Sequence, residues 1–276
     1  MDHRHRRQAG AERGEAVRSA VTALRRLIIR PGAIGDLIVS LPALEFLRPA
    51  EVWVSRPNVP LVRFAESVRA IADTGLDLRE IPAPLIERLR GFDEIHSWYG
   101  AAREEFREAV ASLPFHFHQA LPGPGMHATD FYLQQAGAPP GAAPRIHCQA
   151  ARGDYVVIHP FSGSASKNWP LERFRALAAA MESFAPVHWC AGPEEPLDGA
   201  VRFDELYDLA CWLASGRLYI GNDSGITHLA AAAGAPVIAL FGPTDPGVWA
   251  PRGDRVRVIP TLEAGVAEVL AMVDSS

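Results

Sequence analysis

The sequence predicts an α/β protein with two Rossmann-like domains, whose parallel sheets face each other across a cleft. Short apolar segments with strand character alternate with helical patterns from residue 27 onward. The order of apolar strand, basic residue, proline and small-residue turn occurs at residues 27–35 and again at residues 155–164. Between the two copies, residues 137–144 contain only glycine, alanine and proline, a composition typical of a linker.

We therefore expect a Rossmann-like acceptor domain over residues 27–140 and a Rossmann-like donor domain over residues 150–276. Residues 1–26 form a basic N-terminal tail or helix, with seven arginines against three acidic residues. A frayed tail is the simpler interpretation of this segment. The alternative is a basic arm that touches anionic lipid or an acidic acceptor, and so makes a peripheral contact at the inner face of the membrane.

In the first domain, residues 27–30 predict a buried strand, which residues 31–36 (PGAIGD) break before a helical pattern begins. Further strands are predicted at residues 51–54, 92–98 and 115–119, and helices at residues 63–72 and 104–113. The alternation of phenylalanine and histidine in residues 115–118 places both histidines on one face of a strand.

In the second domain, strands are predicted at residues 155–158, 187–191, 218–220 and 237–241. Helices are predicted from residue 171 and over residues 203–214, 226–233 and 262–273, with Gly234 closing the third. One alternative for the last helix is a return to the first domain. Ligands of parallel sheets bind beyond the carboxyl ends of the strands, and the polar loops of this sequence follow such ends.

Composition excludes several classes of protein. The 48% hydrophobic content and a mean hydropathy of +0.01 predict a soluble globular protein. No apolar run reaches the roughly 18 residues of a membrane span, and no apolar core follows the basic start as in a signal peptide. The three cysteines show no CxxC spacing, which indicates free thiols and a cytoplasmic location. A net charge of −5 argues against nucleic acid as a partner.

Lys167 is the single lysine of the chain, against 26 arginines. It ends a loop rich in hydroxyl groups (SGSASK, residues 162–167), and hydroxyls with an ammonium group can cradle a diphosphate and neutralise it as it leaves. The alternative is an ordinary solvated loop. The lone lysine favours a site that needs a compact point charge.

Two further segments combine glycine, an acid and the start of a helix. Residues 221–225 (GNDSG) precede a helix whose free N–H groups favour phosphate, and His228 lies one turn further along. The alternative is that Asp223 or Ser224 only caps the helix. Asp36 likewise is either a helix cap or a general base that takes a proton from an acceptor hydroxyl.

Glu194, in the turn GPEE at residues 192–195, is a candidate to hold a ribose, with a surface turn as the alternative. Several motifs are absent. The sequence contains no GxGxxG, no Walker lysine motif, no DxD pair and no histidine–cysteine cluster with metal spacing. These absences argue against a nicotinamide-dependent oxidoreductase and against a metal-dependent sugar transferase.

Three segments resemble glycosyltransferase family 9, the ADP-heptose:lipopolysaccharide heptosyltransferases. They are RPGAIGDL with LPAL (residues 30–37 and 41–44), HP through KNWPLERF (159–160 and 167–174), and GNDSGITHLAAA leading to LFGPTDP (221–232 and 240–246). The likeness spans roughly residues 27 to 250. One departure is Phe161, which stands where the family usually has glycine and is expected to crowd the phosphate loop.

The resemblance implies a GT-B fold and inverting sugar transfer without a metal or cofactor. The partners would be a nucleotide-diphosphate sugar, such as ADP-heptose, and a saccharide or glycolipid acceptor, such as the lipopolysaccharide inner core. Asp36 and Lys167 would be catalytic, and Gly32 and Gly35 would belong to a phosphate or acceptor loop. The residues that would bind the donor are Ser162, Gly163, Ser164, Ser166, Glu194, Asp223, Ser224, Gly225, His228 and Thr244.

Two alternatives within this family remain open: a nucleotide-sugar-binding protein that has lost transfer, and a transferase that uses a different sugar and acceptor. The presence of both Asp36 and Lys167 favours an enzyme, because binding alone does not need a base.

Overall fold

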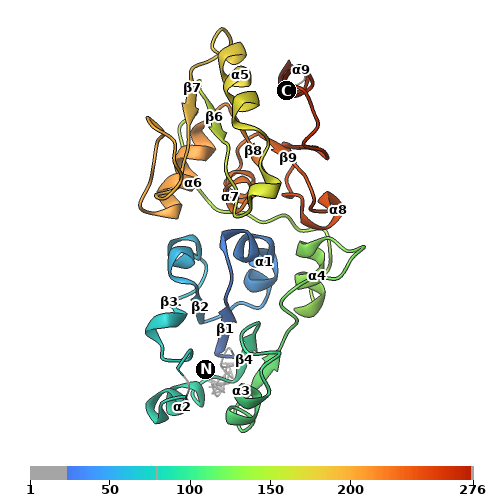
Figure 1. The fold of residues 1–276 in the computed structure, drawn as a ribbon. Helices are drawn as coiled ribbons and strands as arrows, with labels where there is room; N and C mark the ends of the chain where they lie inside the picture. The colour runs from blue at the N-terminus through green and yellow to red at the C-terminus, as the bar shows by residue number, and fades with distance from the viewer. Residues whose placement is uncertain (1–23, 79, 275–276) are drawn as a thin grey trace, which may run out of the picture.

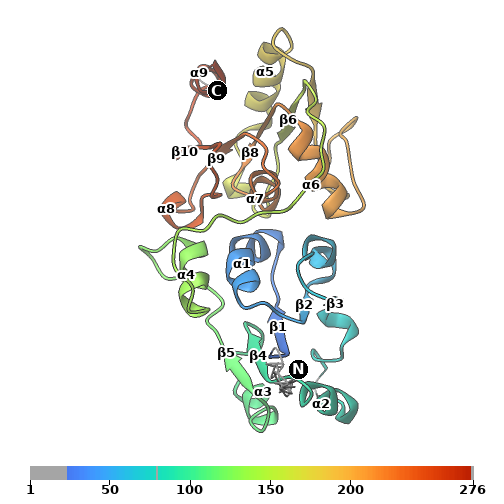
Figure 2. The same cartoon turned by 180° about the vertical axis from the view of Figure 1, so that it is seen from behind.

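The computed structural model describes residues 24–78 and 80–274, and the basic tail lies outside this range except for its last residues. The described chain forms two α/β halves, each built on a sheet of five parallel strands. The half with the second sheet lies above the half with the first in Figures 1 and 2. None of the helices in these residues is long and apolar enough to cross a membrane.

The first sheet has the strand order β3-β2-β1-β4-β5. Its strands are β1 (Arg26–Arg30), β2 (Glu51–Val54), β3 (Ser67–Ala70), β4 (Glu94–Ser97) and β5 (Phe115–Phe117). In the central strand β1, Leu27, Ile28 and Ile29 are fully buried. Both faces of this strand are covered, which is why its sequence is a continuous apolar run. The order reverses direction between β1 and β4, so the carboxyl end of β1 lies at a switch point of the sheet.

The helical segments of this half are α1 (Ile34–Phe46), α2 (Ala83–Leu89), α3 (Glu104–Ala109) and α4 (Ala128–Gln135), with 3₁₀ turns η1 (Arg56–Leu61) and η2 (Ile71–Asp73). The expected helix at residues 63–72 is wrong. Residues 67–70 instead form the edge strand β3, which pairs with β2 in parallel register from Ser67↔Glu51 to Ala70↔Val54. The edge strand has one partner only, so its apolar residues do not show the continuous run of a central strand.

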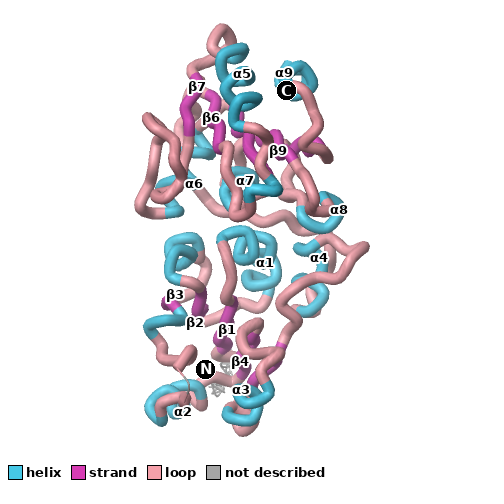
Figure 3. The backbone as a smooth tube through the Cα atoms, in the orientation of Figure 1, coloured by secondary structure: helices cyan, strands magenta, loops and turns pink. Residues whose placement is uncertain are grey.

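The second sheet has the order β10-β9-β8-β6-β7, which reverses between β6 and β8. Its strands are β6 (Val156–His159), β7 (Val187–Trp189), β8 (Leu218–Asn222), β9 (Val237–Leu240) and β10 (Val256–Ile259). Around it lie η3 (Ala165–Lys167), α5 (Leu171–Met181), α6 (Leu206–Ser215), α7 (Gly225–Ala232), α8 (Pro246–Trp249) and α9 (Val266–Asp274). The sequence did not predict α2, α4, α8 or β10. Figure 3 shows how much of the chain between these elements is loop.

The last helix stays with the second sheet and does not return to the first half. Helix α9 packs beside α5. Its Val269 and Val273 join an apolar cluster with Phe174 and Leu177 of α5 and with Ile158 of β6. The burial of this apolar face against α5 and the second sheet explains why α9 packs there.

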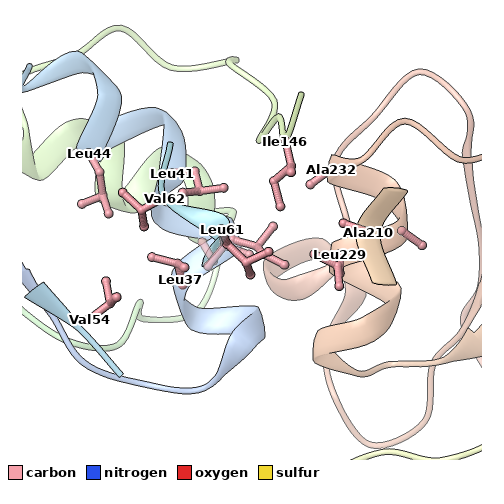
Figure 4. Packing of buried hydrophobic residues seen from close by; sticks show 14 of the residues in the cluster. Leu37, Leu41, Leu44, Val54, Leu61, Val62, Ile146, Ala210, Leu229 and Ala232 are labelled. Atoms are coloured by element: carbon pink, nitrogen blue, oxygen red, sulfur yellow. The ribbon is translucent and has the colours of Figure 1, made fainter. Parts of the chain in front are cut away.

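One apolar cluster contains buried residues from both halves of the molecule. Leu37 and Leu41 of α1 belong to the same buried cluster as Leu229 of α7 and Ala210 of α6 (Figure 4). Separate clusters cover the outer face of each sheet, so each sheet is buried on both sides. The two halves are therefore joined by packing as well as by the linker.

Polar contacts close one side of this junction. The Nε2–H of His127, which caps α4, donates to the carbonyl of Ala250 over 2.9 Å. Arg252 donates through two nitrogens to the two carboxylate oxygens of Asp130, each over 2.7 Å. A bidentate pair of this kind fixes orientation as well as distance.

Leu41→Ala tests the shared core. Leu41 is 1% exposed, and we expect the substitution to lower the free energy of unfolding by about 2–5 kcal/mol, because it leaves a cavity between the halves. The control on the same helix is Phe46→Ala, since Phe46 is 50% exposed and should change stability by about 0.5 kcal/mol or less. Chemical denaturation measures both, and equal effects would contradict a core at Leu41.

Candidate active site

A cavity of about 780 Å³ lies between the two halves. Its walls come from the start of α1, from η1 and α6, from the loops after β6, β7 and β9, and from the start of α7. The loop after β1 and the loops after β6 and β8 leave their sheets at the points where the strand order reverses. The cavity therefore lies where the topology of both sheets predicts a ligand.

Asp36 lies in the first turn of α1 and lines this cavity. Its Oδ2 accepts the backbone N–H of Ala33 over 2.9 Å, so the carboxylate caps the helix. Gly32 makes room for it, because a Cβ at this position would lie 2.8 Å from the Asp36 carboxylate, and its φ of +120° suits glycine. Asp36 is thus a cap that also presents its carboxylate to the cavity.

Two side chains at the start of η1 hold the loop that carries Gly32 in place. The carbonyl of Gly32 accepts from Ser55 Oγ over 2.8 Å and from Asn58 Nδ2 over 3.2 Å. Ser55 and Asn58 line the cavity as well. Sequence reasoning missed both, because no local pattern links residues 55–58 to residue 32.

On the opposite wall, Lys167 and Asp223 form an ion pair. Lys167 Nζ donates to Asp223 Oδ2 over 2.7 Å, and the side chains are 31% and 6% exposed. The lysine comes from η3, after β6, and the aspartate follows β8. The two sequence candidates therefore meet in the structure, and both line the cavity.

Asn222 fixes the loop that carries Lys167 against β8. Its Oδ1 accepts the backbone N–H of Trp169 over 2.9 Å, and its Nδ2 donates to the carbonyl of Pro160 over 2.8 Å. Asn222 is fully buried. The residue therefore ties together both ends of the loop, residues 160–169, and so holds the ammonium group in place.

The first turns of α1 and α7 meet at the floor of the cavity. A Cβ on Gly225 would lie 2.9 Å from Ile34 Cβ and 3.1 Å from the backbone nitrogen of Gly35, so only glycine fits. Ser224 caps α7 by accepting the N–H of Thr227. Both helices thus direct their amino-terminal ends, with a partial positive charge, toward one site.

His228, one turn into α7, is 6% exposed and lines the same cavity. Burial lowers the pKa of its imidazole to about 4, although Asp223 acts in the opposite direction. The side chain is therefore neutral at neutral pH. It can exchange hydrogen bonds with a ligand without adding charge to the site.

The hydroxyl-rich loop lies partly in the cavity. Ser162, Gly163 and Ser164 line it, and so does Thr244 from the loop after β9. Ser166 does not: it is exposed, and its Oγ lies 2.9 Å from Ser164 Oγ. Phe161 is not part of the lining either. Its ring lies edge-on to that of His159, with the ring centroids 6.3 Å apart.

On the wall formed by the loop after β7, the acidic side chain is Glu195, while the predicted Glu194 is exposed and outside the lining. Glu195 Oε2 accepts from His159 Nε2 over 3.0 Å and from the Gly192 N–H over 2.6 Å. Burial acts to raise the pKa of Glu195, but these hydrogen bonds outweigh it and lower the pKa. The neighbouring wall is apolar and consists of Cys190, Phe203, Leu206 and Leu209.

The comparisons with known proteins agree with one another. The model of the family described as Glycosyltransferase family 9 (heptosyltransferase) matches residues 130–271. Lipooligosaccharide heptosyltransferase 2 of Haemophilus influenzae is 28% identical over 125 residues, which are 38% of this chain and 35% of that protein. Lipopolysaccharide heptosyltransferase 1 of Salmonella typhimurium is 32% identical over 117 residues, 37% of each. These matches span little more than a third of the relatives' length.

Solved structures share the fold over most of the chain. The E. coli heptosyltransferase WaaC with ADP has a TM-score of 0.69 and 19% identity, over 91% of this chain and 99% of that one. The E. coli ADP-heptose lipopolysaccharide heptosyltransferase II has a TM-score of 0.74 and 16% identity, over 91% and 98%.

Two parallel sheets with a cleft between them, shared with these structures, define a protein of the GT-B class, as the sequence predicted. The family match covers just over half of the chain. The chain belongs to glycosyltransferase family 9, the heptosyltransferase family.

Gly225→Ala tests the meeting of the two helices. The new Cβ would press on Ile34 and Gly35, so we expect a loss of about 1–3 kcal/mol in unfolding free energy. Gly163→Ala is the control, because Gly163 also lines the cavity but has open space around its Cβ position. Denaturation curves that coincide for the two variants would show that α1 and α7 do not touch at this point.

Proposed function

We propose that this chain is an inverting, metal-independent glycosyltransferase. It moves a sugar, heptose, from an ADP-linked donor to a saccharide hydroxyl such as one of the lipopolysaccharide inner core. The observation that carries the proposal is that Asp36 and Lys167 line one cavity from opposite halves of the molecule. A base for the acceptor and a cation for the leaving group are the two charges that such a transfer uses.

The leaving diphosphate is stabilised by positive charge from the protein. An ammonium group has three N–H donors, so Lys167 can keep its hydrogen bond to Asp223 while it donates to a phosphate oxygen. The amino-terminal ends of α1 and α7 add partial positive charge at the same place. These groups supply what a divalent cation supplies elsewhere, and for this reason we propose transfer without a metal or a cofactor.

Asp36 acts as the general base. The acceptor hydroxyl gives its proton to the carboxylate while its oxygen attacks the anomeric carbon on the face opposite the nucleotide. The new C–O bond forms as the bond to the diphosphate oxygen breaks, and the nucleoside diphosphate leaves. Attack from the opposite face inverts the anomeric configuration.

The remainder of the donor lies along the wall formed by α6 and the loop after β7. The apolar wall with Phe203 and Leu206 suits a nucleobase, and Glu195 is the acid placed to hold ribose hydroxyls. A solved relative contains ADP, and another, with a TM-score of 0.58, is described in complex with ADP-D-β-D-heptose. These ligands support ADP-heptose as the donor, and the names of the curated relatives support a lipopolysaccharide or lipooligosaccharide acceptor.

Donor binding is tested by thermal shift in EDTA with ADP, UDP, GDP, CDP, NAD and ADP-heptose. We expect ADP and ADP-heptose to stabilise the protein, by about 2.7 kcal/mol at a hundredfold excess over Kd. Lys167→Ala should lose this shift, and Lys167→Arg should weaken it because a planar guanidinium replaces a point charge.

The matched control for the lysine is Arg175→Ala, which removes an exposed cation of α5 outside the cavity. It should keep the wild-type shift. No stabilisation of the wild type by any nucleotide would overturn the proposed donor site.

The base is tested by Asp36→Asn. The amide oxygen can still accept the Ala33 N–H, so donor binding should stay near wild type while transfer falls about 10²-fold or more. Asp208→Asn is the control, because Asp208 is an exposed aspartate in the first turn of another helix, α6. Parallel loss of binding and transfer in Asp36→Asn would reduce Asp36 to a cap.

A further inference from the structure

A buried arginine contacts the backbone of the proposed base. Arg30 ends β1 and is 2% exposed. A buried charge normally has a carboxylate partner, because an unpaired charge is costly to remove from water. In the described part of the chain, Arg30 donates hydrogen bonds to three neutral oxygens.

These oxygens belong to the loop and helix that carry the base. Arg30 Nη2 donates to the backbone carbonyl of Asp36 over 2.8 Å, and Nη1 donates to that of Pro31 over 2.9 Å. Nε donates to Ser40 Oγ over 3.1 Å, and that hydroxyl in turn donates to the carbonyl of Leu37. The guanidinium fork thus spans the loop from its first residue to the second turn of α1.

Aromatic rings cover the rest of the guanidinium group. Its Cζ lies 4.8 Å from the ring centroid of Tyr132 on α4 and 6.0 Å from that of Trp98 after β4. Ring faces attract a cation and exclude water from it. The charge of Arg30 therefore acts through a medium that screens it weakly.

The charge of Arg30 interacts with that of Asp36. Burial lowers the pKa of Arg30, while Tyr132 and Asp36 act to raise it. Tyr132 from α4 and His228 from α7 also interact with the Asp36 charge. Tyr132 has a pKa raised by burial and His228 has a pKa of about 4, so both are neutral near pH 7.

Charged groups on three neighbouring segments are paired with other side chains. Lys167 and Asp223 bind each other on the far wall, Arg56 of η1 is paired with Asp73, and Asp130 of α4 with Arg252. Arg30 instead donates to the backbone of Asp36 itself.

We propose that Arg30 is a positioning residue for the transfer: it holds the backbone of Asp36 through its guanidinium fork and so fixes the place of the carboxylate at the cavity. This inference rests on the proposed function. A general base must stay within hydrogen-bond reach of the acceptor hydroxyl, and a small displacement of the base slows proton transfer. Arg30 itself does not line the cavity, so it acts on the transfer through Asp36.

The expected effect follows from this arrangement. A base that is less well held slows the chemical step and lowers kcat, while the donor contacts on the opposite wall stay in place and the donor KM changes little. A general loss of structure would instead lower the thermal midpoint and raise the donor KM together with the fall in kcat.

The experiment compares Arg30→Gln with Arg30→Lys, with kcat and the donor KM measured at saturating acceptor. Both variants keep a side-chain donor but lose the guanidinium fork, and Arg30→Lys also keeps the charge. We expect kcat to fall several-fold in both, while the donor KM stays within about threefold of the wild-type value.

The matched control is Arg26→Gln, at the other end of β1, where the arginine is paired with Glu94. It should leave kcat and the donor KM at wild-type values. Wild-type kcat in a folded Arg30→Gln variant would overturn the proposal, and so would a donor KM that rises as much as kcat falls. If Arg30→Gln does not fold, as judged by its thermal midpoint, wild-type kcat in Arg30→Lys would still overturn the role of the fork.

Failure of the proposed function is distinguished by the wild type itself. If wild type with ADP-heptose shows no transfer, or if Asp36→Asn retains full transfer, the base assignment fails before any Arg30 variant is interpreted. If both behave as proposed, the Arg30 variants test the positioning role alone.

Discussion

The packing of α1 against α7 is the contact on which the rest of the molecule depends. Gly35 and Gly225 let the first turns of the two helices touch, and Leu37, Leu41 and Leu229 continue the contact into a core shared by both halves. Because this core is buried, the halves do not separate without exposing apolar surface to water. The contact therefore sets the width of the cleft and the separation of the groups on its two walls.

The same contact brings positive charge together. Two helix ends, Lys167 and Arg30 converge on one region, and two carboxylates balance them: Asp223 pairs with Lys167, and Asp36 caps α1 above Arg30. For Asp36, the structural interpretation and the chemical interpretation are thus compatible. The cap holds the carboxylate at a helix end, which is also the position from which it can face an acceptor.

The sequence predicted those residues of the cavity lining that belong to local motifs. Glycine turns, a lone lysine in a serine-rich loop and an acid at a helix start are local patterns, and Gly32, Asp36, Lys167, Asp223 and His228 all line the cavity. Its failures have a common cause. The edge strand at residues 67–70 exists because β2 offers it a partner, and Glu195 replaces Glu194 because it can reach His159 from the adjacent strand end.

The sequence by itself determined the α/β class, the two similar halves, the polar turns at strand ends and the family likeness, because each of these is written in residues close together in the chain. The tertiary structure decided which side chains share a cavity, which glycines must stay glycine, and that Arg30 lies buried beneath Asp36. Most of these facts depend on contacts between residues that lie far apart in the chain: Gly225 meets Ile34 and Gly35, and the rings of Trp98 and Tyr132 cover Arg30. Packing and electrostatics select such pairings only when the whole chain is folded.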